Sequence, residues 1–187
     1  MTTEHSSTGT TIIRHRINTI EQLALIPQTQ GIEFDIREGK YGIVVTHDPW
    51  TLGVPFEEFL KHVNHTICIV NVKCEGIEFE ALRILKNAGI ESFFLLDCSF
   101  PMIMKLIRLG ERRIAIRVSE YESVPALHGK VDWVWLDSFV SLPTAEECNR
   151  LRTGYKVCLV SPELQGRTED ALYLRPYVDA VCTKLLR

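Results

Sequence analysis

Eight short runs with the composition of β-strands recur along the chain, and most of them are separated by a stretch with helical spacing. The runs cover 11–16, 31–36, 66–73, 92–98, 113–119, 131–137, 156–161 and 178–184. Strands that alternate with helices favour right-handed βαβ units, which build a parallel sheet. The pattern therefore predicts an α/β fold with parallel strands.

Eight parallel strands of this kind indicate a compact (β/α)8 TIM barrel. The chain has 187 residues, whereas about 250 are typical of that barrel, so several helices must be short or missing. The connection 120–130 leaves the least room for a helix. A doubly wound open sheet is the structural alternative.

Helices can be placed in several of the gaps between these runs. One ends at a glycine stop, Ala88-Gly89, and others cover 102–110 and 56–63. Thr144 and Glu147 form the capping-box pattern that opens a helix before the seventh run. A last helix is expected to open at Thr168.

The length suits a single domain, which we place at 11–187 behind a flexible polar tail at 1–10. A net charge of -3 gives no electrostatic case for nucleic acid binding, and no apolar run approaches the roughly 20 residues that span a bilayer. The N-terminus lacks the basic start and apolar core of a signal peptide. Six cysteines without a CxxC pair predict reduced thiols in a cytoplasmic protein, and a homo-oligomer is left open.

The second run carries the strongest chemical pattern. Ile32, Phe34 and Ile36 alternate with Glu33 and Asp35, which is the period of two expected for a strand. The alternation puts both carboxylates on one face and the three apolar side chains on the other. Two carboxylates on one face are suited to bind a hard cation.

A short strand at 42–46 then delivers His47 and Asp48 near the same end of the sheet. An imidazole beside two carboxylates adds a group that can exchange protons near neutral pH. An ordinary solvated strand face is the alternative interpretation of the same pattern.

Active sites of parallel barrels lie where the strands end, because the βα loops converge there. Polar residues stand at the ends of the eight runs: His15, Arg16, Glu33, Asp35, Asn71, Lys73, Asp97, Ser99, Arg117, Ser119, Asp137, Ser161 and Lys184. Lys73 and Arg117 suit a phosphoryl group, by point charge and by bidentate bonding respectively. Trp135 shares its face with Asp137, so it is placed either to stack on a substrate or to fill a layer of the barrel.

These residues, in this order, resemble the glycerophosphodiester phosphodiesterase family. The matching segments are His15-Arg16, Glu33-x-Asp35, His47-Asp48, Asn71-Val-Lys73, Ser99-Phe100 and Val178-Asp-Ala-Val-Cys-Thr183. The resemblance extends over nearly the whole chain from Thr11 and implies the family's barrel of phospholipase C type.

The resemblance also implies roles for the matching residues. His15 and His47 would be the general acid and base, and Arg16 and Lys73 would hold the phosphate. Glu33 and Asp35, with Asn71 at the third position, would bind Mg²⁺ or Ca²⁺. The implied reaction is a hydrolysis in lipid metabolism, in which a small glycerophosphodiester-like molecule gives an alcohol and a phosphomonoester such as glycerol 3-phosphate.

Three departures from the family pattern alter this expectation. Asn71 stands where the family carries a carboxylate, and its amide oxygen is a neutral and weaker ligand. The family's long loop with Pro-Glu-Asn-Thr shrinks to Ile17-Asn18-Thr19, so its glutamate is missing. Leu159-Val-Ser-Pro162 replaces a Trp-Thr-Val-Asn motif. The sequence therefore predicts weakened metal binding and a pocket open to bulkier substrates.

Two functions of other classes stay open. A catalytically degenerate barrel would bind a phosphorylated metabolite or a partner protein without turnover. A sugar-phosphate lyase or isomerase would use Lys73 as a base or to form a Schiff base.

Overall fold

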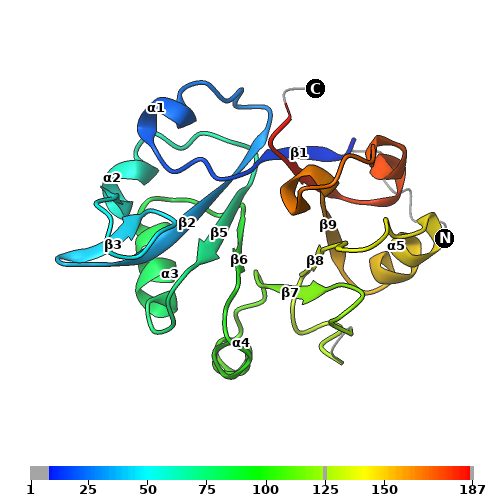
Figure 1. The fold of residues 1–187 in the computed structure, drawn as a ribbon. Helices are drawn as coiled ribbons and strands as arrows, with labels where there is room; N and C mark the ends of the chain where they lie inside the picture. Colours follow the sequence, from blue (N-terminus) through cyan, green and yellow to red (C-terminus); the bar gives the residue numbers. More distant parts are fainter. Residues whose placement is uncertain (1–8, 124–125, 186–187) are drawn as a thin grey trace.

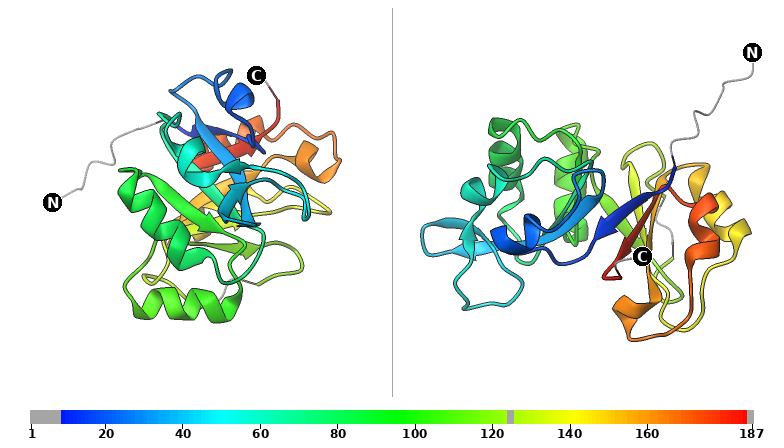
Figure 2. Two further views of the ribbon diagram at one scale, coloured as in Figure 1. Left: turned by 90° about the vertical axis from the view of Figure 1, so that its left-hand side faces the viewer. Right: turned by 90° about the horizontal axis from the view of Figure 1, so that it is seen from above.

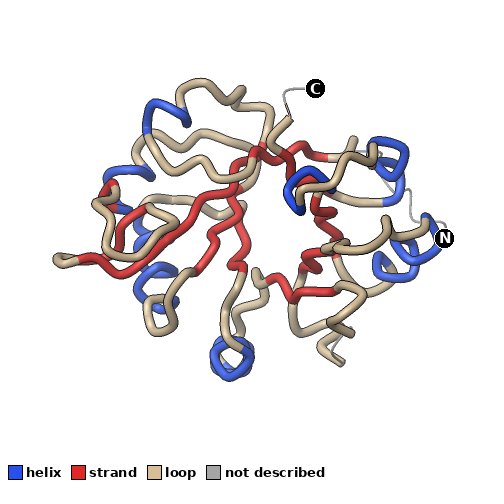
Figure 3. The backbone as a smooth tube through the Cα atoms, viewed as in Figure 1, coloured by secondary structure: helices blue, strands red, loops and turns tan. Residues whose placement is uncertain are grey.

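In the computed structural model, which describes residues 9–123 and 126–185, parallel strands stand around a common centre and the helices lie outside them (Figures 1 and 3). The parallel strands are β1 (Thr11–Arg14), β2 (Gly31–Gly39), β5 (Cys68–Val72), β6 (Phe93–Leu96), β7 (Ala115–Val118), β8 (Trp133–Leu136), β9 (Lys156–Val160) and β10 (Ala180–Thr183). Each begins inside one of the eight predicted runs, so the strand prediction is confirmed. Of the expected tail, only Gly9 and Thr10 lie among the described residues.

The parallel strands follow the order β6-β5-β2-β1-β10-β9-β8-β7. The first strand therefore pairs with the last, and Figure 2 shows β1 and β10 side by side. This is the order of a barrel, not of a doubly wound open sheet.

Strands β6 and β7 meet at the two ends of this order. Among the described residues a single parallel bridge joins them, between Leu95 and Ile114, and the Leu95 N–H donates to the Arg113 carbonyl at 2.8 Å. We call this junction the β6–β7 seam. The sheet is barrel-like, and its backbone pairing is thinnest at the seam.

A hairpin is added to the barrel order after β2. Strands β3 (Gly42–Val45) and β4 (Val54–Pro55) pair antiparallel, with β3 alongside the outer half of β2, so the sheet is mixed. The strand expected at 42–46 is thus confirmed. Its end carries His47 back toward the mouth of the barrel.

The helices are α1 (Ile20–Leu23), α2 (Phe56–Leu60), α3 (Glu78–Asn87), α4 (Phe100–Arg108) and α5 (Ala145–Arg152). The capping box predicted at the start of α5 forms, because Thr144 Oγ1 accepts from the Glu147 N–H and the Glu147 carboxylate accepts from the Thr144 N–H. Helix α4 begins earlier than predicted. Its start is fixed by the Ser99 side chain, which caps it, and by Pro101, which fits the first turn.

The prediction of a helix that opens at Thr168 is wrong. Short 3₁₀ turns take that part of the chain, η1 (Pro162–Gln165) and η2 (Leu172–Tyr177). Pro176 lies inside η2, and its ring lacks the N–H that an α-helix would need at that position. In the connection 120–130 the described residues contain no helix, as its length predicted.

Buried apolar side chains form two layers, one on each face of the strands. Ile32, Phe34 and Ile36 belong to the layer between the strands and the helices. The interior layer consists of Ile13, Ile69, Phe94, Leu96, Ala115, Trp133, Trp135, Cys158, Val160, Ala180 and Cys182. The alternation predicted for 31–36 is therefore confirmed, and it leaves Glu33 and Asp35 on the interior face. No helix among the described residues is long and apolar enough to cross a membrane.

Candidate active site

Glu33 and Asp35 lie on the interior face of β2 and are 0% and 1% exposed. Parallel pairing with β5 sets Asp35 opposite Asn71 and Glu33 opposite Ile69. Burying two carboxylates this close together is costly unless each oxygen has a partner. The partners of these oxygens therefore define the site.

Both oxygens of Glu33 accept hydrogen bonds from the protein. Asn71 Nδ2 donates to Oε1 at 2.9 Å, and the backbone N–H of Arg16 donates to Oε2 at 2.6 Å. Arg16 has φ of 60°, in the left-handed region that a side chain disfavours, so the turn that aims its N–H at Glu33 is strained. Burial and the charge of Asp35 outweigh these bonds and raise the pKa of Glu33 to about 7.

Asp35 is held by an asparagine that sequence reasoning did not select. Asn18 Nδ2 donates to Asp35 Oδ2 at 2.7 Å, and the Asp35 N–H donates back to Asn18 Oδ1 at 2.9 Å. Asn18 is fixed in turn, because its own N–H donates to Gln22, the residue that forms a capping box with Thr19 at the start of α1. The other oxygen, Oδ1, lies 3.4 Å from the ammonium nitrogen of Lys73.

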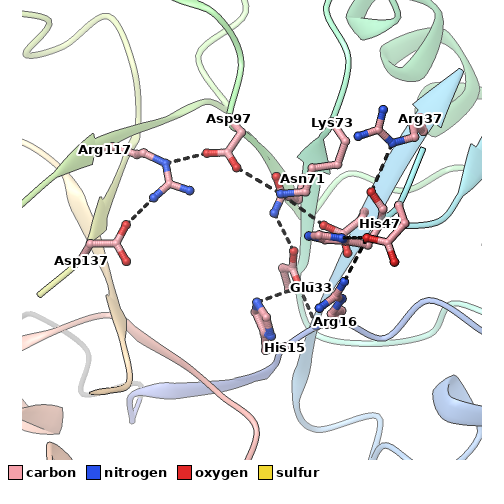
Figure 4. Close-up of polar contacts among 12 residues, drawn as sticks. His15, Arg16, Glu33, Arg37, His47, Asn71, Lys73, Asp97, Arg117 and Asp137 are labelled. Atoms are coloured by element: carbon pink, nitrogen blue, oxygen red, sulfur yellow. Dashed lines mark hydrogen bonds and ion pairs between the residues drawn. The ribbon is translucent and has the colours of Figure 1, made fainter. Parts of the chain in front are cut away.

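From Asp35, charges of alternating sign follow one another along the strand ends (Figure 4). We call Asp35, Lys73, Asp97, Arg117 and Asp137 the alternating charge network. Lys73 Nζ donates to Asp97 Oδ2 at 3.3 Å, and Arg117 Nε donates to Asp97 Oδ1 at 2.7 Å. Arg117 Nη1 then donates to Asp137. The network spans five neighbouring strands or strand ends, from β2 to β8.

The two carboxylates that share Arg117 differ in their burial. The side chain of Asp97 is 21% exposed and that of Asp137 is 1% exposed. Burial opposes ionisation of Asp97, but the hydrogen bond and charge of Arg117 prevail and lower its pKa. For Asp137 burial prevails over the same guanidinium and raises the pKa. Asp97 has φ of 63°, so its backbone is also held in a disfavoured conformation.

The two histidines predicted to exchange protons lie on opposite sides of Glu33 and Arg16 in Figure 4. His15 Nε2 is 3.8 Å from Glu33 Oε2. Burial and the charge of Lys184 lower the pKa of His15 to about 4, so its imidazole is neutral at neutral pH. His15 Nδ1 is buried with no hydrogen-bond partner among the described residues.

His47 is positioned by charged neighbours from its own loop and from β2. Its Nδ1 is 2.6 Å from Asp48 Oδ1, and its carbonyl accepts from Arg37 Nε at 3.2 Å. Arg16 Nη2 lies 3.7 Å from the same oxygen of Asp48, so the guanidinium is close to His47. The Arg16 side chain is 39% exposed and can reach a ligand.

The structure brings the predicted residues His15, Arg16, Glu33, His47, Asn71, Lys73 and Arg117 to one end of the barrel-like sheet (Figure 4), and Asp35 joins them through its contact with Lys73. Trp135 lies below them in the interior layer, with 5% exposed, so it fills a layer of the barrel and offers little surface for stacking. Arg117 is bound to two carboxylates. The expected roles of these residues stay predictions.

The side chains predicted to hold a divalent metal do not fit the ion in this arrangement. All four oxygens of Glu33 and Asp35 face a protein donor, and Asn71 turns its amide nitrogen toward Glu33. Asn71 Oδ1 is buried without a partner among the described residues, but Ca²⁺ takes roughly six to eight oxygen ligands. In the described part of the chain, no three His, Cys, Asp or Glu side chains are grouped to hold a metal ion.

No protein-family model and no curated protein sequence matches the chain. Two crystal structures from Agrobacterium tumefaciens str. C58 resemble it over 94% of its length. One is a protein assigned as a glycerophosphoryl diester phosphodiesterase, with a TM-score of 0.67, 14% identity and 94% of its own chain covered. The other is a glycerophosphodiester phosphodiesterase, with a TM-score of 0.60, 16% identity and 95% covered.

The chain has the fold of a glycerophosphodiester phosphodiesterase. The resemblance inferred from His15-Arg16, Glu33-x-Asp35 and His47-Asp48 is confirmed at the level of the fold. The identities of 14% and 16% agree with a sequence that has diverged at several motifs of the family.

Proposed function

We propose that the protein is a phosphodiesterase that hydrolyses a small glycerophosphodiester-like molecule to an alcohol and a phosphomonoester. The proposal is supported above all by the placement of His15, Arg16, His47 and Lys73 around buried carboxylates at one end of a barrel-like sheet. The glycerophosphodiester phosphodiesterase fold of the chain agrees with this chemistry.

The surroundings of the two histidines suggest a division of labour. His15 is neutral at neutral pH, so it accepts the proton of the attacking hydroxyl. Attack by water gives the phosphomonoester directly, whereas attack by a neighbouring alcohol of the substrate first gives a cyclic phosphodiester, which water then opens to the phosphomonoester. His47 Nδ1 is held by Asp48, which leaves Nε2 to donate a proton to the departing alkoxide. Each transfer typically contributes about 10²–10⁴-fold to the rate.

Cationic side chains would bind the phosphate and stabilise the charge that develops on it. Arg16 combines exposure with a long contact of 3.7 Å to Asp48, so its guanidinium can turn to a phosphate oxygen. Lys73 supplies a second charge at the end of β5, 3.4 Å from Asp35. Because Glu33, Asp35 and Asn71 do not fit a divalent metal as arranged, no step of this mechanism passes through an ion.

The direct test is to incubate the protein with a panel of glycerophosphodiesters and with bis(p-nitrophenyl) phosphate, and to follow the products by phosphorus NMR. Hydrolysis should give a phosphomonoester and an alcohol in equal amounts. A panel in which every diester stays intact at protein concentrations near those of the substrate would contradict the proposal.

One observation favours a second function, namely binding of a phosphorylated metabolite without turnover. Lys73 and Arg117, the cations expected to meet the phosphate, each contact two carboxylates of the alternating charge network. A protein of this kind would bind a phosphomonoester in calorimetry and hydrolyse no diester. The proposed enzyme, present at catalytic concentration, would hydrolyse the diester.

A further inference from the structure

The acidic centre of the site is Glu33 with Asp35, and every one of its carboxylate oxygens has a protein partner. Arg16 and Asn71 supply the donors to Glu33, and Asn18 and Lys73 supply the partners of Asp35. A cation bound to these carboxylates would have to displace at least some of these partners. The centre is thus already complete without an ion.

We propose that the ammonium group of Lys73, assisted by the amides of Asn18 and Asn71, occupies the role of the divalent cation in this barrel, so that the site binds no divalent metal. For its bearing on catalysis this inference rests on the proposed function. As a statement about metal binding it stands on the contacts alone.

The position of Lys73 supports this substitution. Its nitrogen lies 3.4 Å from Asp35 Oδ1 and 3.3 Å from Asp97 Oδ2, so one cation at the end of β5 bridges two carboxylates from the strands on either side, β2 and β6. A divalent ion beside Asp35 would stand within a few ångströms of this ammonium group and would be repelled by it. Arg117 keeps Asp97 in place and so holds the second anchor of Lys73.

The orientation of the Asn71 amide also argues against a divalent ion at this site. Its Nδ2 donates to the fully buried Glu33, and turning the amide over would set Oδ1 against the carboxylate oxygen and remove a donor from it. The amide therefore acts on Glu33 as a hydrogen-bond donor. A carboxylate at the same position would instead add further negative charge beside Glu33 and Asp35 and require a cation.

Burial adds a further obstacle to an ion. Glu33 and Asp35 are 0% and 1% exposed, and Asn71 is 6% exposed. Mg²⁺ loses its hydration shell reluctantly and usually keeps several water molecules. A hydrated ion could not reach these oxygens without moving the side chains that cover them.

Titration with Mn²⁺, followed by the electron paramagnetic resonance signal of the free ion, tests the inference on the chelator-treated full chain. The wild type should leave the signal unchanged up to about 1 mM Mn²⁺, the weak end of protein cation sites. The double variant Asn71→Asp/Lys73→Met should bind one ion at least tenfold more tightly. The matched control Asn64→Asp/Lys61→Met makes the same charge change at two exposed positions and should behave like the wild type.

The variant Lys73→Met alone guards against a double variant that does not fold. It removes the ammonium group that repels a divalent ion, so Mn²⁺ should raise its melting temperature while leaving that of the wild type unchanged. A folded Lys73→Met that Mn²⁺ does not stabilise would contradict the inference. Wild-type binding of one ion below about 1 mM, lost in Asp35→Asn, would overturn the inference. So would a folded double variant that still binds no ion, because Lys73 and Asn71 would then not be what excludes it.

Diesterase assays separate this inference from the proposed function. If the wild type hydrolyses a diester equally well with and without EDTA, both stand. If it binds no ion and hydrolyses no diester, the proposed function fails and the inference about the metal survives. Hydrolysis that EDTA abolishes, and that Mn²⁺ restores, would overturn the inference while supporting the enzyme.

Discussion

Arg117 donates a hydrogen bond of 2.7 Å from Nε to Oδ1 of Asp97, and this contact crosses the β6–β7 seam. In the described part of the chain, the backbone at the seam is joined by one bridge, between Leu95 and Ile114. Arg117 also reaches Asp137 at the end of β8, so its guanidinium links three successive strand ends. The side-chain network thus reinforces the sheet where the described backbone pairing is thinnest.

Replacing Arg117 with alanine should lower the free energy of unfolding by about 2–3 kcal/mol, because it leaves the nearly buried Asp137 without its cation. Urea unfolding measures this loss. Arg108→Ala, at an exposed arginine near the end of α4, is the control and should change stability by less than about 0.5 kcal/mol. Equal losses in both variants would show that Arg117 does not hold the seam.

Alanine at His15 or at His47 should reduce diester hydrolysis by about 10²-fold or more while leaving the circular dichroism spectrum unchanged. The control is His62→Ala, since His62 is half-exposed on the surface and its ring is 3.8 Å from Glu58, away from the barrel mouth. Full activity in both His15→Ala and His47→Ala would exclude the proposed acid and base. A loss in His62→Ala of the same size would indicate a general structural effect.

Glu120 should make stability fall at low pH. Burial is the largest single influence and raises its pKa, but the hydrogen bonds from the backbone N–H groups of Phe139, Ser141 and Val140 together prevail and lower its pKa to about 2. Because the unfolded pKa is about 4.3, the carboxylate stabilises the fold above that value, and the stabilisation is lost as the pH falls from about 4 toward 2.

The Glu120→Gln variant should therefore lose about 1 kcal/mol of stability at pH 7, discounted for exposure, and little at pH 2. Urea midpoints measured across pH 2 to 7 would show the difference converging at the acid end. Glu38→Gln, at an exposed carboxylate on β2, should give parallel curves for wild type and variant. A gap that stays constant with pH would contradict the assignment to Glu120.

Trp50 should affect substrate binding and not stability. It follows His47-Asp48-Pro49, is fully exposed, and has φ of 64°, a conformation that favours glycine. Trp50→Gly relieves this strain and adds freedom to the unfolded chain, so stability should change by less than about 1 kcal/mol.

If Trp50 forms a wall of the substrate pocket, the same variant should raise KM for the diester roughly fivefold, equivalent to an aromatic contact of about 1 kcal/mol. Tyr41→Gly removes another exposed aromatic side chain, at the tip of the β2–β3 hairpin, and should leave KM unchanged. An unchanged KM in Trp50→Gly would place the substrate elsewhere.

Much of the fold follows from local patterns that the sequence displays. The alternation of Ile32, Phe34 and Ile36 with Glu33 and Asp35 fixes which face of β2 meets the helices, since a slip of one residue would bury the opposite set. The capping pair Thr144 and Glu147 marks the start of α5 for a similarly local reason. Thr168 misled because residues 168–171 adopt no regular structure, and the 3₁₀ turn η2 that follows them contains Pro176, whose ring lacks the N–H of an α-helix.

The side-chain contacts inside the site could not be predicted as well as the secondary structure. Glu33 and Lys73 were identified because strand ends gather at one mouth of a barrel, which is a rule about topology. That Lys73 lies between Asp35 and Asp97 depends on side-chain geometry across three strands. Asn18 could have been found, since Asn18-Thr19 retains the last two residues of the family's Pro-Glu-Asn-Thr motif, but its contact with Asp35 depends on the shortened loop that carries it.

Pairing between β1 and β10 has a consequence for how the chain folds during its synthesis. Thr11 faces Ala180 across the sheet, so the first strand gains one of its two neighbours only after the chain through residue 180 has left the ribosome. Contacts of such long sequence separation slow folding, because the loop entropy is lost before the pairing is gained. Until β10 arrives, both ends of the growing sheet remain open edges to which another chain could pair.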